Sequence, residues 1–312
     1  MKFAVFGTGG VGGYFGGRLA QAGHDVTFIA RGRHLAAIKE NGLRVESGLG
    51  DFIIKPASAT DNPASIGPVD VILVAVKAWD IPSAAESMKP MIGENTLVIP
   101  LENGVDAVDL LSASLGREHI LGGLCRISSF ISAPGLIKHI GVQPSIAFGE
   151  LDNRKSDRVE RILRVFQDVP GLTAEIPDDI HKAIWQKFIF IVAVSGVGAV
   201  TRQPIGKYRS VPETREIIIK ALEEVVQVGK ARGISLDDNT AETILVNVID
   251  NISEGTIASM QKDIMEGRPS ELEAQTGAVV RMGKRLGVPT PINDFLYACL
   301  LPMELKAREK SL

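Results

Sequence analysis

The stretch MKFAVFGTGGVGGYFGGRLAQAGHDVTFIAR, residues 1–31, decides the fold. The apolar run at residues 2–6 predicts a buried strand, and the apolar spacing at residues 11–20 predicts a helix. A second strand is expected at residues 25–29. A strand, a glycine-rich turn, a helix and a second strand in this order are typical of a dinucleotide-binding βαβ unit.

The glycine-rich turn has the spacing that a pyrophosphate requires. Gly7, Gly9 and Gly12 stand in GxGxxG order, where they allow a tight turn, close approach of the phosphates and close packing of helix on strand. Gly10 and Val11 complete the loop, and the N–H groups at the helix N-terminus favour an anion. No Gly-Lys-Ser/Thr closes the loop, so a P-loop is disfavoured.

The residues after the second strand favour NADP over NAD. An NAD site usually has a carboxylate there for the ribose hydroxyls, but this chain has Arg31, and no carboxylate follows until Glu40. A guanidinium suits a 2′-phosphate through charge-assisted hydrogen bonds. The alternative is a solvated surface arginine.

Composition limits the classes of partner and of site. The chain of 312 residues suits two domains, and its net charge of −3 gives no reason to expect nucleic acid or an anionic membrane. Cys125 and Cys299 lie in no metal or CxxC spacing, and the five histidines show no ligand spacing, so no metal site is expected. Reduced cysteines and an N-terminus that is itself a strand indicate a cytoplasmic protein without a signal peptide.

One apolar segment resembles a membrane span. Residues 188–200, FIFIVAVSGVGAV, form a run of 13, whereas a span needs about 20. We therefore expect a buried core helix in a soluble protein.

The order of predicted elements indicates an α/β fold with two domains. Residues 1–177 alternate strands and helices, which predicts a Rossmann-type parallel sheet that binds NADP, and residues 178–312 predict an all-helical domain for substrate and catalysis. Further strands are expected at 43–47, 51–55, 69–76, 96–99 and 172–176, with short antiparallel additions between 120 and 148. Helices are expected at 33–41, 152–168, 180–200, 212–232, 239–252 and 271–286. The helices of the second domain could form a homodimer interface or only that domain's core.

Two polar residues follow predicted strands of the parallel sheet, where such sheets bind ligands. Lys77 could reach a cofactor phosphate, and Asn103 could hydrogen-bond a ribose, a catalytic group or the substrate. The alternatives are a surface lysine and an Asn-Gly turn.

Candidate catalytic residues stand in the second half. Lys187 lies in a helix that is apolar on nearly every face, and desolvation of its ammonium would lower its pKa toward the range of a general acid. A lysine that snorkels to water is the alternative. Ser259 shares a helix face with Asp263. Ser270 fits the N-cap of the next helix, so Glu271 could be catalytic or could simply favour the helix N-terminus.

Together these residues resemble the ketopantoate reductase (2-dehydropantoate 2-reductase) family over nearly the whole chain. The matching motifs are GTGGVG with Arg31, Ala75-Val76-Lys77-Ala78-Trp79, Glu102-Asn103-Gly104, Trp185-Gln186-Lys187, and Ser259-Met260-Gln261-Lys262-Asp263 with Arg268 and Glu271. The resemblance implies NADPH-dependent reduction of a 2-keto acid to a 2-hydroxy acid, with pantoate made for coenzyme A synthesis.

The resemblance also implies a role for each matching residue. Lys187 would protonate the carbonyl oxygen, Glu271 would hydrogen-bond near that oxygen, and Asn103 would hold both Lys187 and the cofactor. Ser259 would bind the substrate carboxylate. Arg31 and Lys77 would hold the 2′-phosphate end of NADP.

The chain departs from the family beyond the lysine. Ketopantoate reductases carry asparagines one and two turns past it and another after a following proline, whereas this chain has Ile191, Ser195 and Ile205. Ser195 replaces an amide only in part as a substrate contact, and each lost hydrogen bond costs about 1–3 kcal/mol when a buried partner is left unpaired. The alternatives are therefore a reductase of another 2-keto acid and, in a different class, a protein that senses NADP without turnover.

Overall fold

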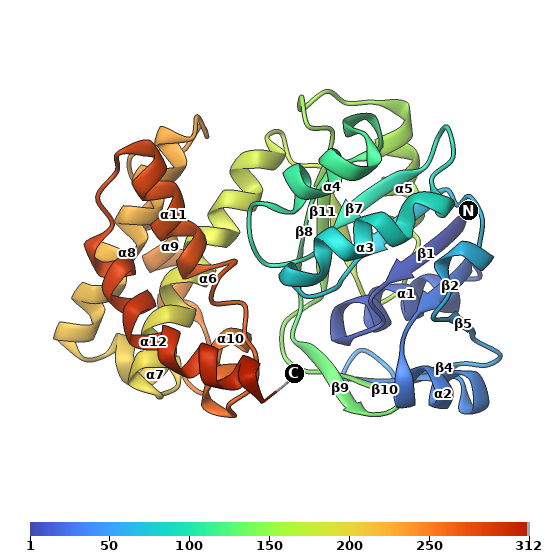
Figure 1. Cartoon of the computed structure of the whole chain (residues 1–312), viewed down its shortest axis with the longest axis horizontal. Helices are drawn as coiled ribbons and strands as arrows, with labels where there is room; N and C mark the ends of the chain where they lie inside the picture. Colours follow the sequence, from blue (N-terminus) through green and yellow to red (C-terminus); the bar gives the residue numbers. More distant parts are fainter. Residues whose placement is uncertain (311–312) are drawn as a thin grey trace. The chain divides into compact units, whose positions relative to one another are not determined.

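The computed structural model describes residues 1–310 (Figure 1). The chain forms two compact units. The first contains Met1–Glu102 and Asp106–Ile180, and the second contains Asn103–Val105 and the chain from His181 onward.

The first unit is built on a five-stranded parallel sheet, as expected for a Rossmann-type fold. Its strand order is β5-β2-β1-β6-β7, with every neighbouring pair parallel. The strands are β1 (Lys2–Phe6), β2 (Asp25–Ile29), β5 (Ser58–Thr60), β6 (Val71–Val74) and β7 (Leu97–Pro100). The helices that accompany them are α1 (Gly10–Gln21), α2 (Gly32–Asn41), α3 (Ile81–Met88) and α4 (Ala107–Leu115), with single 3-10 turns η1 (Pro63–Ser65), η2 (Ala78–Asp80), η3 (Lys89–Met91) and η4 (Arg117–His119).

Alternation along β1 builds a core on each face of this sheet. Phe3 and Val5 belong to one buried cluster, which includes residues of α1, while Ala4 and Phe6 belong to a second, which includes residues of α3 and α4. Side chains of a strand point alternately to its two faces, so a parallel sheet covered on both sides needs a continuous apolar run. The run KFAVF supplies it.

Two smaller sheets complete the first unit. One has the order β4-β3-β10-β9 and the other β12-β11-β8. Their strands are β3 (Leu43–Ser47), β4 (Phe52–Ile54), β8 (Gly122–Arg126), β9 (Ser129–Ala133), β10 (Leu136–His139), β11 (Ser145–Gly149) and β12 (Thr173–Glu175). The antiparallel pairing expected between 120 and 148 is present, because β9 pairs with β10 and β8 with β11. These strands form separate sheets, however, in which β10 also pairs parallel with β3 and β11 with β12. Helix α5 (Asp157–Gln167) supplies the crossover that the second pair requires.

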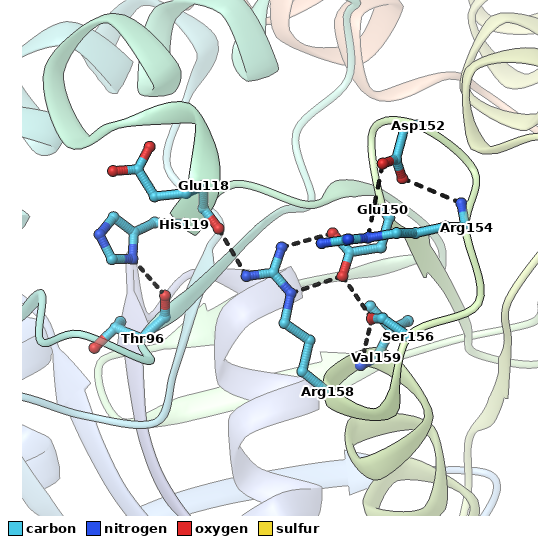
Figure 2. A network of polar contacts seen from close by, with 9 residues as sticks. All are labelled: Thr96, Glu118, His119, Glu150, Asp152, Arg154, Ser156, Arg158 and Val159. Atoms are coloured by element: carbon cyan, nitrogen blue, oxygen red, sulfur yellow. Dashed lines mark hydrogen bonds and ion pairs between the residues drawn. The ribbon is translucent and has the colours of Figure 1, made fainter.

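A polar network follows β11 (Figure 2). Glu150, only 4% exposed, accepts hydrogen bonds from Nε and Nη2 of Arg158 and from Oγ of Ser156, each at 2.6 Å. Arg158 also donates through Nη1 to the carbonyl of Glu118 at 2.8 Å. Burial alone would raise the pKa of the Glu150 carboxyl, but the hydrogen bonds from Arg158 and Ser156 outweigh it and hold that pKa below its usual value. The network joins the end of β11 to α5 and η4.

The second unit is helical. Its elements are α6 (Ile180–Thr201, whose first residue belongs to the first unit), α7 (Ile205–Arg209), α8 (Pro212–Ala231), α9 (Thr240–Asn247), α10 (Ser259–Met265), α11 (Thr276–Leu286) and α12 (Pro291–Glu309), with one 3-10 turn, η5 (Ile249–Asn251). Buried residues of α6, α7, α8 and α11 share one apolar cluster. The helix expected over 239–252 breaks into α9 and η5, and α12 was not anticipated.

Helix α6 is longer than the apolar run that the sequence indicates. It is 22 residues long, and among the described helices it alone has the length and hydropathy of a candidate span. The length of the 13-residue run therefore does not exclude a membrane span. Burial supports the core interpretation instead, since 61% of its most apolar window is buried inside the protein.

Candidate active site

The glycine loop has closed positions and an open one. Gly7 has φ +97°, and a Cβ there would lie 2.7 Å from the carbonyl oxygen of Ala75. A Cβ at Gly12 would lie 2.2 Å from the carbonyl oxygen of Gly7, and one at Gly10 would lie 2.3 Å from a carbonyl of β9. A Cβ at Gly9 would meet no atom within 4 Å. Packing thus explains three glycines, while Gly9 opens onto free space.

The open space lies at the N-terminus of α1, for which Gly9 is the N-cap residue. The first N–H groups of a helix have no partner within the helix. No acidic side chain lies in the first turn of α1, and no side chain caps it. Free N–H groups, a missing Cβ and the absence of negative charge together fit a pyrophosphate.

Two cations stand near the ends of strands in the same unit. Arg31 is exposed and forms the N-cap of α2, which has no acidic residue in its first turn. Lys77, also exposed, follows β6, and its Nζ lies 5.7 Å from the ring centroid of Trp79. The glycine loop is fixed to the end of β2, because the hydroxyl and the N–H of Thr8 both donate to the carbonyl of Ile29.

His34, in the first turn of α2, adds little positive charge beside Arg31. Burial lowers the pKa of its imidazole, although a backbone contact with Thr8 opposes the change in part. Its Nδ1 accepts the N–H of Gly135 at 3.0 Å, which fits a neutral ring. The positive charge at the start of α2 therefore belongs to arginine.

In the second unit, Asn103 and Glu271 meet. Nδ2 of Asn103 donates to Oε2 of Glu271 at 3.3 Å, and Glu271 is 6% exposed. The following Gly104 has φ +135°, and a Cβ there would lie 3.3 Å from the carbonyl oxygen of Ala274. The Asn-Gly pair thus lies in a bend, and it places the amide of Asn103 on a buried carboxylate.

Glu271 lies in a turn and not in a helix. The helix expected to start there begins at Thr276, and residues 271–275 form turns. The N-cap role expected for Ser270 was therefore wrong: its hydroxyl donates to the carboxylate of Glu304 at 2.5 Å. Glu304 was not predicted, because helix α12 was not recognised in the sequence.

Lys187 and its helix neighbours lie in α6. Lys187, Ile191 and Ser195 are spaced by four residues and so share a face of this helix. Lys187 and Ile191 are half-buried, whereas Ser195 is 1% exposed. Ile205 is completely buried in the apolar cluster of the helical unit. Its side chain packs in the core, at the position where ketopantoate reductases have an asparagine.

Ser259 is the exposed first residue of α10. The helix is fixed by Gln261, which is completely buried and donates to the carbonyl of Gln203 at 2.8 Å. Asp263, on the face of Ser259, accepts two hydrogen bonds from Arg268. Of the predicted catalytic and substrate-binding residues, Asn103 and Glu271 are joined by a hydrogen bond, while Lys187 and Ser259 lie on two other elements, α6 and α10.

Within residues 1–310, no three side chains of His, Cys, Asp or Glu come together in a way that could hold a metal ion.

Comparison with known proteins gives a family match for each half of the chain. A family model described as "Ketopantoate reductase PanE/ApbA" matches residues 3–153, and one described as "Ketopantoate reductase PanE/ApbA C terminal" matches residues 179–304. An uncharacterized oxidoreductase, YkpB, from Bacillus subtilis is 31% identical, over 96% of this chain and 98% of its own. A 2-dehydropantoate 2-reductase from Mesorhizobium japonicum is 28% identical, over 96% of both chains.

Solved structures share the fold. A PanE/ApbA family ketopantoate reductase from Ralstonia eutropha has a TM-score of 0.88 and 30% identity, and the match covers 99% of this chain and 100% of that one. A D-mandelate dehydrogenase solved with NADH and anilino(oxo)acetate has a TM-score of 0.90 at 24% identity, with 99% of each chain covered, and this likeness extends to the fold alone.

Proposed function

The chain belongs to the ketopantoate reductase family, and from this premise we propose that it reduces 2-dehydropantoate to pantoate with NADPH. The Asn103–Glu271 hydrogen bond carries the proposal: an amide beside a buried carboxylate lies in the unit that also contains the half-buried Lys187. An oxidoreductase of this family needs both a dinucleotide site and a proton donor. We assign the first to residues 1–177 and the second to residues 178–312.

The cofactor is held by the first unit. The loop of Gly7, Gly9, Gly10, Val11 and Gly12 would bind the pyrophosphate at the N-terminus of α1, as the open side of Gly9 supports. Arg31 and Lys77 would bind the 2′-phosphate, which favours NADP over NAD. When bound, the reduced nicotinamide supplies a hydride to C2 of the keto acid.

The helical unit handles the proton and the substrate. Lys187 gives a proton from its Nζ to the C2 oxygen as that carbon is reduced, and it is reprotonated from solvent. Glu271 orients the reacting oxygen, and Asn103 holds the Glu271 carboxylate and contributes to cofactor binding. Ser259 binds the substrate carboxylate, with Ser195 as a further substrate contact. One keto acid, one NADPH and one proton give one hydroxy acid and one NADP⁺.

The proposal places the enzyme in the pathway that supplies pantothenate and coenzyme A. Its partner is a small 2-keto acid and not nucleic acid or a membrane. We further propose a cytoplasmic location. The helical unit is the part that would form a homodimer.

Oxidation of NADPH on addition of 2-dehydropantoate tests the proposal directly. Lys187→Ala should lower kcat by about 100-fold or more while the Kd for NADPH stays within about 3-fold. Lys182→Ala is the matched control, since Lys182 lies on the same helix and forms an ion pair with Asp237 at 2.7 Å. Equal turnover by Lys187→Ala and wild type contradicts the assignment of the proton donor. Binding of NADPH without turnover of any 2-keto acid favours a cofactor sensor instead.

Ile191 favours a second candidate, a reductase of a 2-keto acid with an apolar side chain. This half-buried residue lies one turn beyond Lys187, and it cannot donate a hydrogen bond to a substrate hydroxyl. The ratio of kcat/KM for 2-dehydropantoate to that for branched 2-keto acids without a hydroxyl separates the two. A higher value for the branched acids would select the second candidate.

A further inference from the structure

A buried carboxylate on α12 holds the residue that precedes Glu271. Glu304 is 1% exposed, and its oxygens accept the backbone N–H of Ser270 at 3.0 and 3.2 Å and the Ser270 hydroxyl at 2.5 Å. Nε of Arg308 lies 2.7 Å from the same carboxylate, and its Nη2 donates to the carbonyl of Ser270 at 3.2 Å. The amide, hydroxyl and carbonyl of one residue are therefore fixed by two side chains one helical turn apart.

The same helix also holds the other side of Glu271. The hydroxyl of Tyr297, on α12, donates to Oε1 of Glu273 at 2.5 Å. Arg281 contacts Oε2 of Glu273 at 2.5 Å and donates to its carbonyl at 2.7 Å. Burial, reinforced by the bond to Glu273 and its charge, raises the pKa of Tyr297 to about 12, so its hydroxyl stays protonated as the donor.

These contacts restrict the turn at residues 271–275 more than its own hydrogen bonds do. Within it, the N–H groups of Ala274 and Gln275 both donate to the carbonyl of Glu271, and the N–H of Leu272 donates to the Ser270 hydroxyl at 3.3 Å. The N–H of Gly277 donates to the carbonyl of Leu272. A non-helical turn has more backbone freedom than a helix. Contacts from α12 to Ser270 and Glu273 fix the chain on both sides of Glu271, and so fix its carboxylate beside Asn103.

Stability alone is a weak reason for this arrangement. A buried ion pair is expensive to desolvate, and apolar residues of similar volume often stabilise a fold equally well. A leucine at position 304 could pack, but it could not hold the amide and hydroxyl of Ser270. The carboxylate at position 304 therefore serves to hold Ser270 in place.

We propose that Glu304 is a positioning residue for Glu271 and acts through Ser270. This inference rests on the proposed function, in which Glu271 orients the reacting oxygen. Displacement of a reacting group by about 1 Å can cost on the order of 100-fold in rate. The kcat should therefore depend on Glu304, although the contacts described for its carboxylate are with Ser270 and Arg308.

The test compares Glu304→Leu and Glu304→Gln in the full-length enzyme. Glu304→Leu should lower kcat by about 30-fold, and Glu304→Gln, which keeps one acceptor for the Ser270 N–H, by about 5-fold. The Kd for NADPH should stay within about 2-fold of wild type for both. If Glu304→Leu does not fold, Ser270→Ala takes its place, because it removes only the hydroxyl.

Glu224→Leu is the matched control for lost stability. Glu224, on α8, accepts the backbone N–H groups of Ile292 and Asn293 at 2.8 and 2.9 Å, so it fixes the start of α12 as Glu304 fixes Ser270. It should lower the Tm while kcat at 25 °C stays within about 2-fold of wild type. An equal loss of kcat in Glu224→Leu would mean general destabilisation and would overturn the proposal.

A double-mutant cycle with Glu271→Gln separates this inference from the proposed function. Glu271→Gln should lower kcat by about 100-fold, and adding Glu304→Leu should lower it little further, because both act through one carboxylate. A combined loss of about 3,000-fold, the product of the two, would overturn the positioning role but leave Glu271 catalytic. Unchanged kcat in Glu271→Gln would overturn both.

Discussion

Nδ2 of Asn103 lies 3.3 Å from Oε2 of Glu271, although 168 residues separate them in sequence. Because Glu271 is 6% exposed, its carboxylate has limited access to water and depends on protein donors. The amide of Asn103 is one such donor. A negative charge at position 103 should therefore repel the ionised Glu271 carboxylate.

Asn103→Asp should harm the reaction more at high pH than at low pH. Two carboxylates at this distance repel when both are ionised, and a proton shared between them at lower pH relieves the repulsion. Asn103→Ala only loses a hydrogen bond to a charged group, worth about 1.5–3 kcal/mol or about 10–100-fold in kcat/KM. Profiles of kcat/KM against pH for both variants check this, with the exposed Asn247→Asp as control. Identical profiles for the two variants would refute the argument from charge.

Gly9→Ala should weaken cofactor binding, whereas Gly12→Ala should destabilise the fold. A methyl group at Gly9 meets nothing in the protein, so the cost to folding is the N-cap preference of about 1 kcal/mol or less, but the methyl occupies the space assigned to the pyrophosphate. A methyl group at Gly12 meets the carbonyl oxygen of Gly7 and should destabilise the fold by about 3 kcal/mol.

Titration of NADPH fluorescence and thermal unfolding distinguish the two glycines. Gly9→Ala should raise the Kd for NADPH by about 10-fold or more with a small change in Tm. Gly12→Ala should lower the Tm first. Unchanged affinity in Gly9→Ala would exclude a pyrophosphate at this loop.

Arg31→Ala should weaken NADPH and spare NADH. The variant loses charge-assisted hydrogen bonds to a 2′-phosphate, so the KM for NADPH should rise by about 10-fold or more, whereas NADH lacks that phosphate. Lys39→Ala, at the exposed far end of α2, is the matched control. Parallel loss of both cofactors would show that Arg31 does not read the phosphate. Wild-type preference for NADH would contradict the NADP assignment itself.

Local patterns predict much of this fold. Strand β1 and helix α6 start where the sequence indicates, at Lys2 and Ile180, because apolar runs and the GxGxxG spacing act within a few neighbouring residues. Helix α12 was missed. Its contacts depend on partners such as Glu224 and Ser270, which lie 68 and 34 residues from the residues they bind.

The candidate site was predictable in its residue types more than in its geometry. Asn103 alone was equally consistent with a turn, and the structure places it in a bend where it donates to Glu271. The sequence of the Ser270-Glu271 pair favours a capped helix start, yet hydrogen bonds between Ser270 and the distant Glu304 hold the pair outside a helix. Periodicity carries no information on such long-range bonds, so Glu304 had no local signal.

Arg158→Met should destabilise the first unit far more than Arg164→Met. Arg158 forms two hydrogen bonds of 2.6 Å to the buried Glu150. Its loss leaves that carboxylate with the hydrogen bond from Ser156 in Figure 2, at a cost of about 3 kcal/mol. Arg164, on the same helix, is 67% exposed and lies 4.0 Å from Glu160, a pair worth at most about 0.5 kcal/mol. Urea unfolding of both variants measures the difference. Equal stabilities would mean that the network contributes nothing to folding.

The Glu150 network should also make stability depend on acid. Its folded pKa lies below the usual value of 4.5, so the unfolded chain takes up the proton first. The stabilisation is therefore complete above about pH 5 and is lost as the pH falls through the folded pKa. Glu150→Gln, which cannot ionise, should be less stable than wild type at about pH 7, and the gap should narrow toward about pH 3.5. Urea unfolding at several pH values checks this, with Glu160→Gln as an exposed control on α5, and a gap that stays constant with pH would show that ionised Glu150 is not what stabilises the network.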